Sequence, residues 1–164
     1  MCVLSDYSIK ERIDELFNSP ISLNSIQPCS VDLLLREDLI NLDGEEFNLD
    51  AGDYILQPDE FILGSTSEYV TIPNDLVAQV DGKSSIGRLG VMIHVTAGYI
   101  DAGFNGNITL EIKNISNKPF TLKKGMSICQ IIFFELTTEV TRTYGDESLG
   151  SHYQNSIGTI RSRL

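Results

Sequence analysis

The sequence predicts an all-β fold. Short apolar or alternating runs follow one another along the chain, separated by dipeptides typical of β-turns. These dipeptides are Asp43-Gly44, Ala51-Gly52, Asp81-Gly82, Asn105-Gly106 and Lys124-Gly125. No alternation of strands with long helical segments and no repeat of fixed period is visible, which disfavours a parallel α/β architecture. We expect about ten strands in a barrel or sandwich, forming a single domain over residues 1–164.

The first element is expected to be one short helix, ended by Pro20. Ser8 and Glu11 have the spacing of a capping box. Apolar residues then follow at helical spacing: Ile9, Ile13, Leu16 and Phe17.

The central strands lie around the Asn105-Gly106 turn. The segment "GVMIHV" is typical of a strand, and in "NITLEIK" the residues Ile108, Leu110 and Ile112 alternate with polar ones. Such alternation predicts a half-buried strand with Thr109 and Glu111 on its polar face. The last segment, about 143–164, is polar, contains glycine and has little periodicity, so we expect an extended arm that orders on another surface.

Composition excludes several classes of protein. A net charge of −11 argues against a protein that coats nucleic acid, which needs a basic face. No apolar run approaches the roughly 20 residues of a membrane span, and the N-terminus lacks the pattern of a signal peptide. Three cysteines without CxxC spacing suit reduced thiols. We therefore expect a cytoplasmic protein.

A phosphate-binding segment is suggested by "GKSSIGR", although it is no P-loop. Walker A requires a glycine where this chain has Val77, and a helix where the chain predicts a strand. Lys83, Ser84, Ser85 and Arg88 still combine cations and hydroxyls as a phosphate site does. A solvated turn is the alternative.

Two carboxylates are candidates for chemistry. Glu111 could be a general acid/base in a partly buried site, or a surface glutamate paired with a lysine. Asp101, across the Asn105-Gly106 turn, could reach the same pocket or could simply cap a turn. His94 in its apolar strand is typical of a core residue, and His152 lies in the polar arm. We expect no zinc site, because the HxE…PCxxC signature of zinc deaminases is missing.

Several motifs together resemble the dCTP deaminases of the dUTPase-like superfamily. They are "VLSDYSIKERI", "IQPCSVDLLL", "GKSSIGRLGVMIHVTAGYIDAGFNGNITLEIKN", "KKGMSICQIIFFEL" and "YGDESLGSHYQNSIGTIRSRL". The resemblance implies a distorted β-barrel with a short N-terminal helix and a C-terminal arm. It also implies metal-free deamination at C4 of cytosine, a homotrimer with shared active sites, Mg²⁺ carried by the triphosphate, and dTTP as a possible feedback inhibitor.

The resemblance also assigns residues to roles. Glu111 matches the catalytic glutamate, with Ser84, Arg88 and Asp101 as further catalytic residues. Asp101 would lie at the deoxyribose 3′-hydroxyl, and Thr109 to Glu111 would read the base edge. The full set expected to bind substrate is Lys83, Ser84, Ser85, Ile86, Gly87, Arg88, Asp101, Thr109, Leu110, Glu111, Gln130, Tyr144, His152 and Ser156.

In the resemblance, the pair Gly98-Tyr99 indicates which product is released. Relatives that release dUTP carry a His-Arg pair there, whereas those that continue to dUMP carry glycine and an aromatic residue. The resemblance therefore favours a bifunctional, dUMP-forming enzyme that acts on dCTP and dUTP. The alternatives are a deaminase that releases dUTP, a plain dUTPase and a non-catalytic nucleotide-binding module.

Two positions depart from the family pattern. "HYQNS" stands where many relatives have KYQxQ, so His152 and Ser156 replace lysine and glutamine. Lys83 replaces the usual arginine, exchanging a bidentate fork for a point charge. Because histidine titrates near neutrality, phosphate binding could become pH-dependent.

Overall fold

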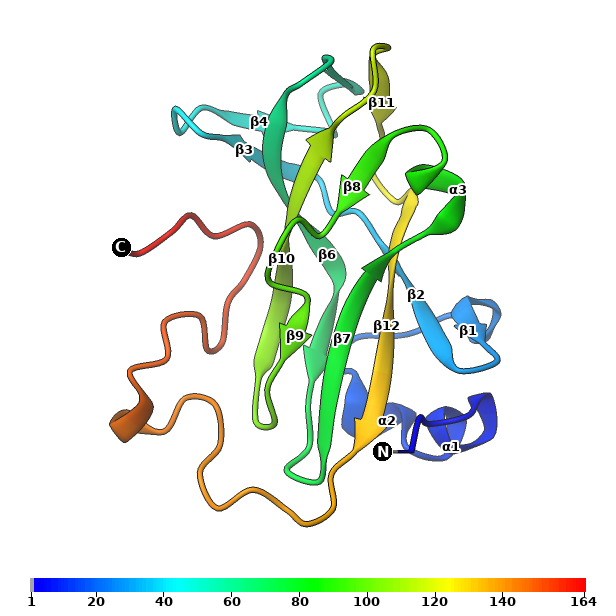
Figure 1. The fold of residues 1–164 in the computed structure, drawn as a ribbon, viewed down its shortest axis with the longest axis vertical. Coiled ribbons are helices and arrows are strands. Elements are labelled where there is room, and N and C mark those ends of the chain that lie inside the picture. Colours follow the sequence, from blue (N-terminus) through cyan, green and yellow to red (C-terminus); the bar gives the residue numbers. More distant parts are fainter. Residues whose placement is uncertain (1) are drawn as a thin grey trace.

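Strands form most of the regular structure in the computed structural model, which describes residues 2–164 (Figure 1). The helices are short: α1 (Asp6–Glu11), α2 (Ile13–Leu16), α3 (Ser84–Gly87) and the 3₁₀ turns η1 (Leu23–Ser25) and η2 (Glu147–Leu149). The strands are β1 (Ile26–Gln27), β2 (Ser30–Leu34), β3 (Asp38–Asn41), β4 (Glu46–Asn48), β5 (Tyr54–Leu56), β6 (Phe61–Thr71), β7 (Leu76–Gly82), β8 (Val91–Ile93), β9 (Tyr99–Ile100), β10 (Asn105–Asn114), β11 (Phe120–Leu122) and β12 (Ser127–Glu135). The all-β prediction is confirmed.

The strands pair into two large antiparallel sheets and one small one. The first sheet has the order β1-β2-β12-β7-β9, the second β4-β3-β6-β10-β8, and β11 pairs with β5. Within the described residues the hydrogen-bonded ladders stay separate, so the strands do not close into a continuous barrel. Both large sheets contribute to one cluster of buried apolar side chains, including Leu33, Phe133, Ile62 and Leu110.

Strand β10 shows why these residues fold as they do. Ile108, Leu110 and Ile112 are buried, whereas Thr109 and Glu111 are only partly so. The predicted alternation is therefore present, and it directs Glu111 away from the core. Strand β10 lies between β6 and β8, so both of its edges are paired.

The N-terminal helix differs from its prediction. Ser5 is the N-cap, and its hydroxyl accepts a hydrogen bond from the Ser8 amide at 3.3 Å. The prediction of a capping box that starts at Ser8 was therefore wrong, because Ser8 lies inside α1. The helical stretch also breaks at Arg12 and ends at Leu16, ahead of the predicted stop at Pro20.

Arg12 fixes this helical stretch to the start of β7. Its guanidinium contacts both carboxylate oxygens of Asp75, at 2.8 and 2.9 Å. The guanidinium holds the pKa of Asp75 below its usual value of 3.8. Because the folded-state pKa is depressed, this stabilisation is complete above the unfolded-state pKa and is lost as the pH falls through the folded-state pKa.

Asp75→Asn is expected to lower the free energy of unfolding by about 1 kcal/mol at pH 7, since the pair is partly exposed. Urea unfolding at several pH values checks this, with the exposed Asp43→Asn as control. The difference between wild type and variant should shrink once the pH falls below the usual aspartate range. A difference that persists undiminished in acid would contradict the role of the charge.

The C-terminal arm returns to the second sheet of its own chain. After β12 it passes below the sheets and then turns back beside β10, at the left of Figure 1. Ser156 forms a parallel bridge with Gly106 of β10. The predicted arm is thus present, and the surface on which it orders is β10.

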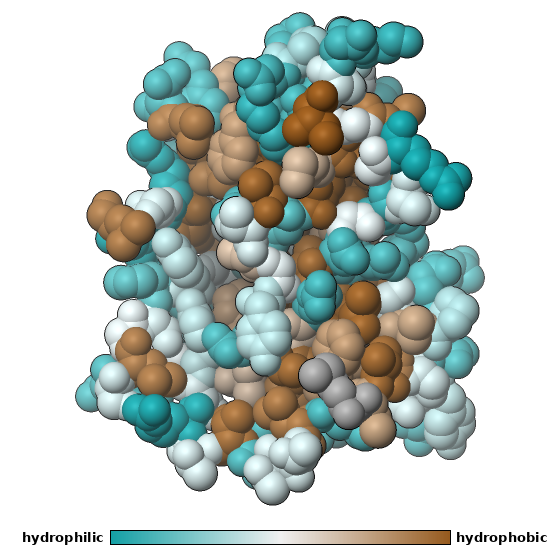
Figure 2. All heavy atoms as spheres, in the orientation of Figure 1, coloured by the Kyte–Doolittle hydropathy of each residue, from teal (hydrophilic) through white to brown (hydrophobic). Residues whose placement is uncertain are grey.

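Figure 2 shows apolar and polar side chains interspersed on one face of the molecule. Several apolar side chains are well exposed in the single chain, among them Leu89, Tyr99 and Ile115. None of the helices within residues 2–164 has the length and apolar character needed to cross a membrane.

Candidate active site

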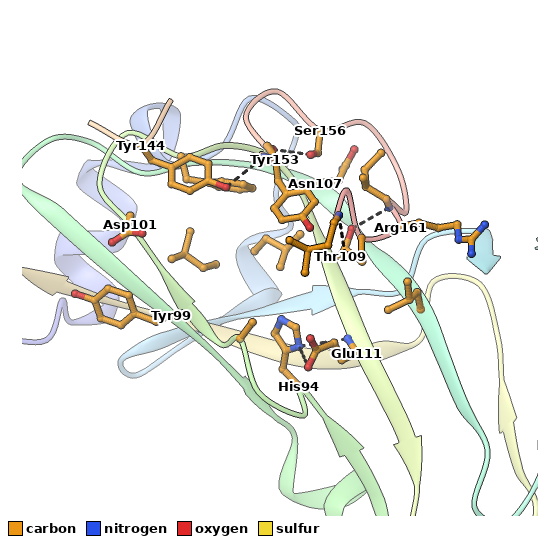
Figure 3. A pocket seen from close by; sticks show the side chains of 18 of the residues that line it. His94, Tyr99, Asp101, Asn107, Thr109, Glu111, Tyr144, Tyr153, Ser156 and Arg161 are labelled. Carbon is orange, nitrogen blue, oxygen red and sulfur yellow. Dashed lines mark hydrogen bonds and ion pairs between the residues drawn. The ribbon is translucent and has the colours of Figure 1, made fainter. Parts of the chain in front are cut away.

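A pocket of about 750 Å³ lies between β10, β9 and the C-terminal arm (Figure 3). Both β10 and the arm contribute polar residues to its lining. The labelled residues around it are His94, Tyr99, Asp101, Asn107, Thr109, Glu111, Tyr144, Tyr153, Ser156 and Arg161. The pocket therefore brings together both carboxylates that the sequence suggested, Asp101 and Glu111.

The Glu111 carboxylate is oriented by Thr96. The Thr96 amide donates to Oε2 at 2.8 Å, and the Thr96 hydroxyl donates to Oε2 at 3.0 Å and to Oε1 at 3.3 Å. With its side chain about one quarter exposed, the carboxylate is both fixed and accessible. A fixed carboxylate that reaches solvent can exchange a proton with a bound water.

His94 faces Glu111 as a neutral imidazole. Burial lowers the pKa of His94, an effect that outweighs the opposing influence of the Glu111 charge. His94 Nδ1 also accepts a hydrogen bond from the Glu111 amide at 3.3 Å, which requires an unprotonated nitrogen. The separation of 3.5 Å between Nδ1 and Oε2 is therefore not an ion pair, and the Glu111 carboxylate keeps its charge available for other partners.

Asp101 lies between two cavities. It lines the main pocket and also a second one of about 450 Å³, which contains Arg142 and His152. Tyr144 and Tyr153 line both cavities and so form their common wall. A ligand that extends past Asp101 would enter this second cavity, whose lining includes Arg142.

Several predicted contact residues are engaged by the arm. Thr109 Oγ1 accepts from the Ile160 amide at 3.0 Å, and Ser156 Oγ donates to the Tyr153 carbonyl at 2.6 Å. The Tyr144 ring packs edge-on against Phe104, and its hydroxyl accepts from the Tyr153 amide at 3.3 Å. The contact with Thr109 joins the arm to the polar face of β10, whereas the contacts of Ser156 and Tyr144 with Tyr153 lie within the arm.

The remaining predicted residues lie outside the pocket lining. This holds for the segment 83–88, for Gln130 and for Leu110, whose side chain is fully buried in the core. The Lys83 ammonium is paired with Asp32, and Gln130 accepts from the Ser30 hydroxyl at 3.1 Å. Within one chain, the predicted site thus divides into a carboxylate-bearing pocket and a separate cationic segment around α3. In Figure 1, α3 and the last residues of the arm lie on opposite sides of the view.

Gly98 occupies a position without room for a side chain. A Cβ there would lie 2.7 Å from the carbonyl oxygen of Val80. The Gly98 carbonyl in turn accepts from the Val80 amide at 2.7 Å, which holds the chain beside β7. The neighbouring Tyr99 is exposed and lines the pocket.

Sequence reasoning did not assign His94, Thr96, Tyr153 or Arg161 to the site. His94 and Glu111 meet because Ile93 is opposite Ile112 in the β8–β10 register. Alternation predicts which face a residue occupies, but it does not fix which residue of the next strand lies opposite. For Arg161, its place in a polar arm gave no indication that it would line the pocket.

Comparison with known proteins identifies the family. The family model described as dCTP deaminase-like matches residues 3–136. A protein of Halobacterium salinarum named "dCTP deaminase, dUMP-forming" is 44% identical, covering 99% of this chain and 94% of the relative. One of the same name from Methanothermobacter thermautotrophicus is 42% identical, covering 100% and 94%.

Two solved structures are similar to this chain in fold. The 2′-deoxycytidine 5′-triphosphate deaminase of Agrobacterium tumefaciens aligns with a TM-score of 0.70 and 24% identity, over 80% of this chain and 47% of that one. The dUTPase of EIAV aligns with a TM-score of 0.53 and 19% identity, over 78% and 88%. From the family match and the full-length relatives together, this chain belongs to the dCTP deaminase-like family.

Proposed function

We propose that this protein deaminates dCTP and then hydrolyses the bound product to dUMP and diphosphate. Relatives that match almost the full chain are named "dCTP deaminase, dUMP-forming". The single observation that carries the proposal is the Glu111 carboxylate, fixed by Thr96 and directed into the pocket.

The geometry supports a general acid/base role for Glu111. The carboxylate takes a proton from water as the oxygen adds to C4 of cytosine, and then delivers a proton to the departing amino group, which leaves as ammonia. Thr96 keeps the carboxylate oriented throughout. His94 stays neutral and therefore does not compete with the reacting groups for the Glu111 charge.

The second step cleaves the bond between the α- and β-phosphoryl groups. Water attacks the α-phosphorus of dUTP, and diphosphate leaves with the electrons of the broken P–O bond. Asp101 is proposed to hold the deoxyribose 3′-hydroxyl, while the exposed Tyr99 completes the wall next to it. Mg²⁺ is expected to arrive with the triphosphate and to balance the charge of the leaving diphosphate.

The proposal is tested by incubating the protein with dCTP and Mg²⁺ and separating the products by ion-exchange chromatography. We expect dUMP to accumulate. Accumulation of dUTP instead would leave the deamination and remove the second step. Unchanged dCTP would contradict the proposal, and hydrolysis of added dUTP would then indicate a plain dUTPase.

The triphosphate site is proposed to form between subunits of a homotrimer. Lys83, Ser84 and Arg88 carry the cations and hydroxyls that phosphates need, yet these residues lie outside the pocket of their own chain. Exposed apolar side chains such as Leu89 and Ile115 supply surface for such an assembly. A neighbouring subunit would then bring its α3 segment to the pocket that holds Glu111.

Mixing two inactive variants tests this shared site. Glu111→Gln and Arg88→Ala should each lose activity alone, and mixed oligomers formed by unfolding and refolding them together should regain part of it. The restored activity arises because some sites take both intact residues from different subunits. Mixtures that remain inactive, although they contain both variants in one oligomer, would contradict the shared site.

We further propose that the protein works in the cytoplasm and that dTTP inhibits it. Cys2, Cys29 and Cys129 are all free thiols, which suits a reducing compartment. Inhibition by dTTP follows from the family resemblance and is checked by adding dTTP to the product assay.

A further inference from the structure

The C-terminal arm runs beside β10 as an added parallel strand for a short distance. The Asn155 amide donates to the Asn105 carbonyl at 2.7 Å, and the Asn107 amide donates to the Ser156 carbonyl at 2.9 Å. Beyond Ser156 this exchange of backbone hydrogen bonds stops. Arm residues 158–160 are therefore held to the sheet by other contacts.

Side chains take over from the β10 backbone at arm residues 158–160. The three successive amides donate to Asn107 Oδ1 at 3.0 Å, to Asp38 Oδ2, and to Thr109 Oγ1 at 3.0 Å. We call Asp38, Asn107 and Thr109 the arm anchor. Asp38 is its only charged member and comes from a different strand, β3, so it contributes the strongest acceptor.

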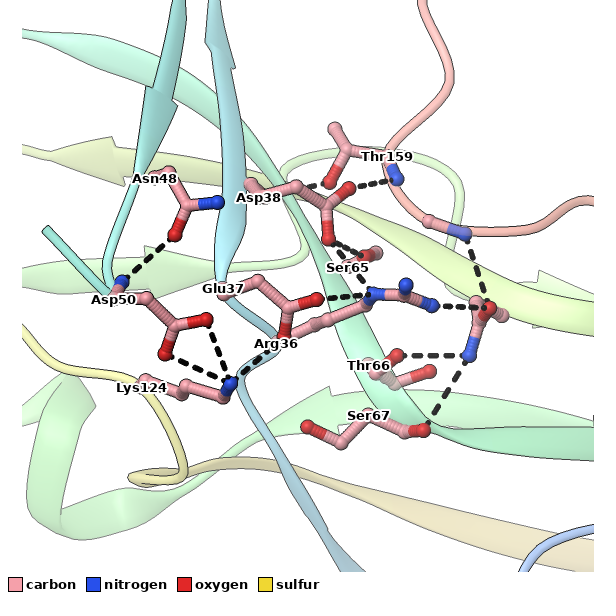
Figure 4. A network of polar contacts seen from close by, with 12 residues as sticks. Arg36, Glu37, Asp38, Asn48, Asp50, Ser65, Thr66, Ser67, Lys124 and Thr159 are labelled. Carbon is pink, nitrogen blue, oxygen red and sulfur yellow. Dashed lines mark hydrogen bonds and ion pairs between the residues drawn. The ribbon is translucent and has the colours of Figure 1, made fainter.

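Asp38 is itself held in position for this contact (Figure 4). Its Oδ1 lies 3.0 Å from Arg36 Nε, which leaves Oδ2 for the arm. Arg36 also donates to Asn107 Oδ1 at 3.2 Å, so it supports two members of the anchor. The Asp38 carbonyl accepts from the Thr159 hydroxyl at 2.7 Å, a second link to the same arm residue.

Gly158 lets the arm approach Asp38 this closely. A Cβ at Gly158 would lie 2.8 Å from Asp38 Oδ2, and the residue has a φ of +70°. Both the space and the backbone conformation favour glycine here. Asp38 and Gly158 therefore form a matched pair across the interface between β3 and the arm.

The anchor sets the outer wall of the pocket. Ile160, whose amide the anchor holds, and the following Arg161 and Leu164 line the same cavity as Glu111. We propose that Asp38 is a positioning residue for the reaction. It fixes the arm over the pocket and thereby increases the affinity of the enzyme for its nucleotide, without contacting the nucleotide itself. Only the kinetic consequence of this inference rests on the proposed function.

The kinetic test compares Asp38→Ala with wild type and with the control Asp14→Asn, an exposed aspartate of α2 outside the pocket lining. Losing a hydrogen bond to a charged acceptor should raise the KM for dCTP roughly tenfold. The kcat should change by less than about twofold, since Glu111 and Thr96 are untouched. Asp38→Asn keeps one oxygen that can accept from the Thr159 amide but loses the second acceptor, which faces Arg36, so it should recover only part of the lost affinity. A fall in kcat with unchanged KM would overturn the proposal.

A second readout does not depend on turnover. Trypsin cleavage after Arg161, followed by the intact mass of the protein, reports how often the arm leaves its anchor. Asp38→Ala should be cleaved about tenfold faster than wild type, and Asp14→Asn at the wild-type rate. Equal cleavage of Asp38→Ala and wild type would overturn the anchor even if dCTP turned out not to be a substrate.

A double-mutant cycle separates arm positioning from damage to β3. Gly158→Ala should loosen the arm by itself, because its new methyl group meets Asp38 Oδ2. In the Asp38→Ala/Gly158→Ala protein that collision is removed, while the backbone strain of alanine at a φ of +70° remains. The cleavage rate of the double variant should therefore rise by less than the product of the two single effects. Effects that simply multiply would show that Asp38 acts independently of the arm and would overturn the proposal.

Discussion

Glu111→Gln is expected to reduce the deamination of dCTP about 10²- to 10⁴-fold in kcat. The amide has the shape of the carboxylate, and its oxygen can still accept hydrogen bonds from the Thr96 amide and hydroxyl. It cannot take a proton from the attacking water. Binding of dCTP, measured by calorimetry, should change far less than kcat, because the pocket keeps its form.

The matched control for this variant is Glu11→Gln, an exposed glutamate at the end of α1. It should leave both kcat and dCTP binding at wild-type values. If Glu111→Gln retained wild-type kcat, general acid/base catalysis by this residue would be excluded.

Gly98→Ala is expected to lower both the stability and the activity of the protein. Its Cβ would lie 2.7 Å from a backbone oxygen of β7, which cannot rotate away. Either the Val80–Gly98 contact lengthens or β9 moves. Overpacking of this kind lowers the free energy of unfolding by about 1–3 kcal/mol. Activity should fall as well, because Tyr99 follows Gly98 as the first residue of β9, and Asp101 follows that strand.

Urea unfolding measures the first effect, and Gly87→Ala is its stability control, since a Cβ at Gly87 would meet nothing within 4 Å. The product ratio measures the second effect. A displaced Tyr99 and Asp101 should shift the products of Gly98→Ala from dUMP towards dUTP. Wild-type stability together with a wild-type product ratio would show that Gly98 is not constrained as the structure indicates.

Local patterns predicted the fold well where they depend on the chain alone. The alternation in β10 placed Ile108, Leu110 and Ile112 in the core and Glu111 outside it, as the structure confirms. Three of the predicted turn dipeptides, Asp43-Gly44, Ala51-Gly52 and Lys124-Gly125, lie between strands. Asp81-Gly82 and Asn105-Gly106 were wrong as turns, because they lie at the end of β7 and at the start of β10. The helix start was less predictable, because Ser5 and Ser8 are both good caps and tertiary packing selects between them.

The site was predictable in part. Several ordered motifs predicted the family of the protein, which the family model confirms. The two predicted carboxylates, Asp101 and Glu111, do line one pocket. The partners of Glu111 were not predictable, because Thr96 and His94 reach it through strand register and loop path. Nor did the sequence indicate that Asp38 would meet an arm residue 121 positions later. The roles of the segment 83–88 and of Gln130 stay predictions, since one chain alone does not bring them to the pocket.

The most direct test of the central claim, that one pocket converts dCTP to dUMP, follows labelled dCTP in the presence of excess unlabelled dUTP. If both steps occur before release, label should appear in dUMP from the earliest times while the dUTP pool stays unlabelled. Label that accumulates in dUTP and reaches dUMP only later would contradict a single continuous site.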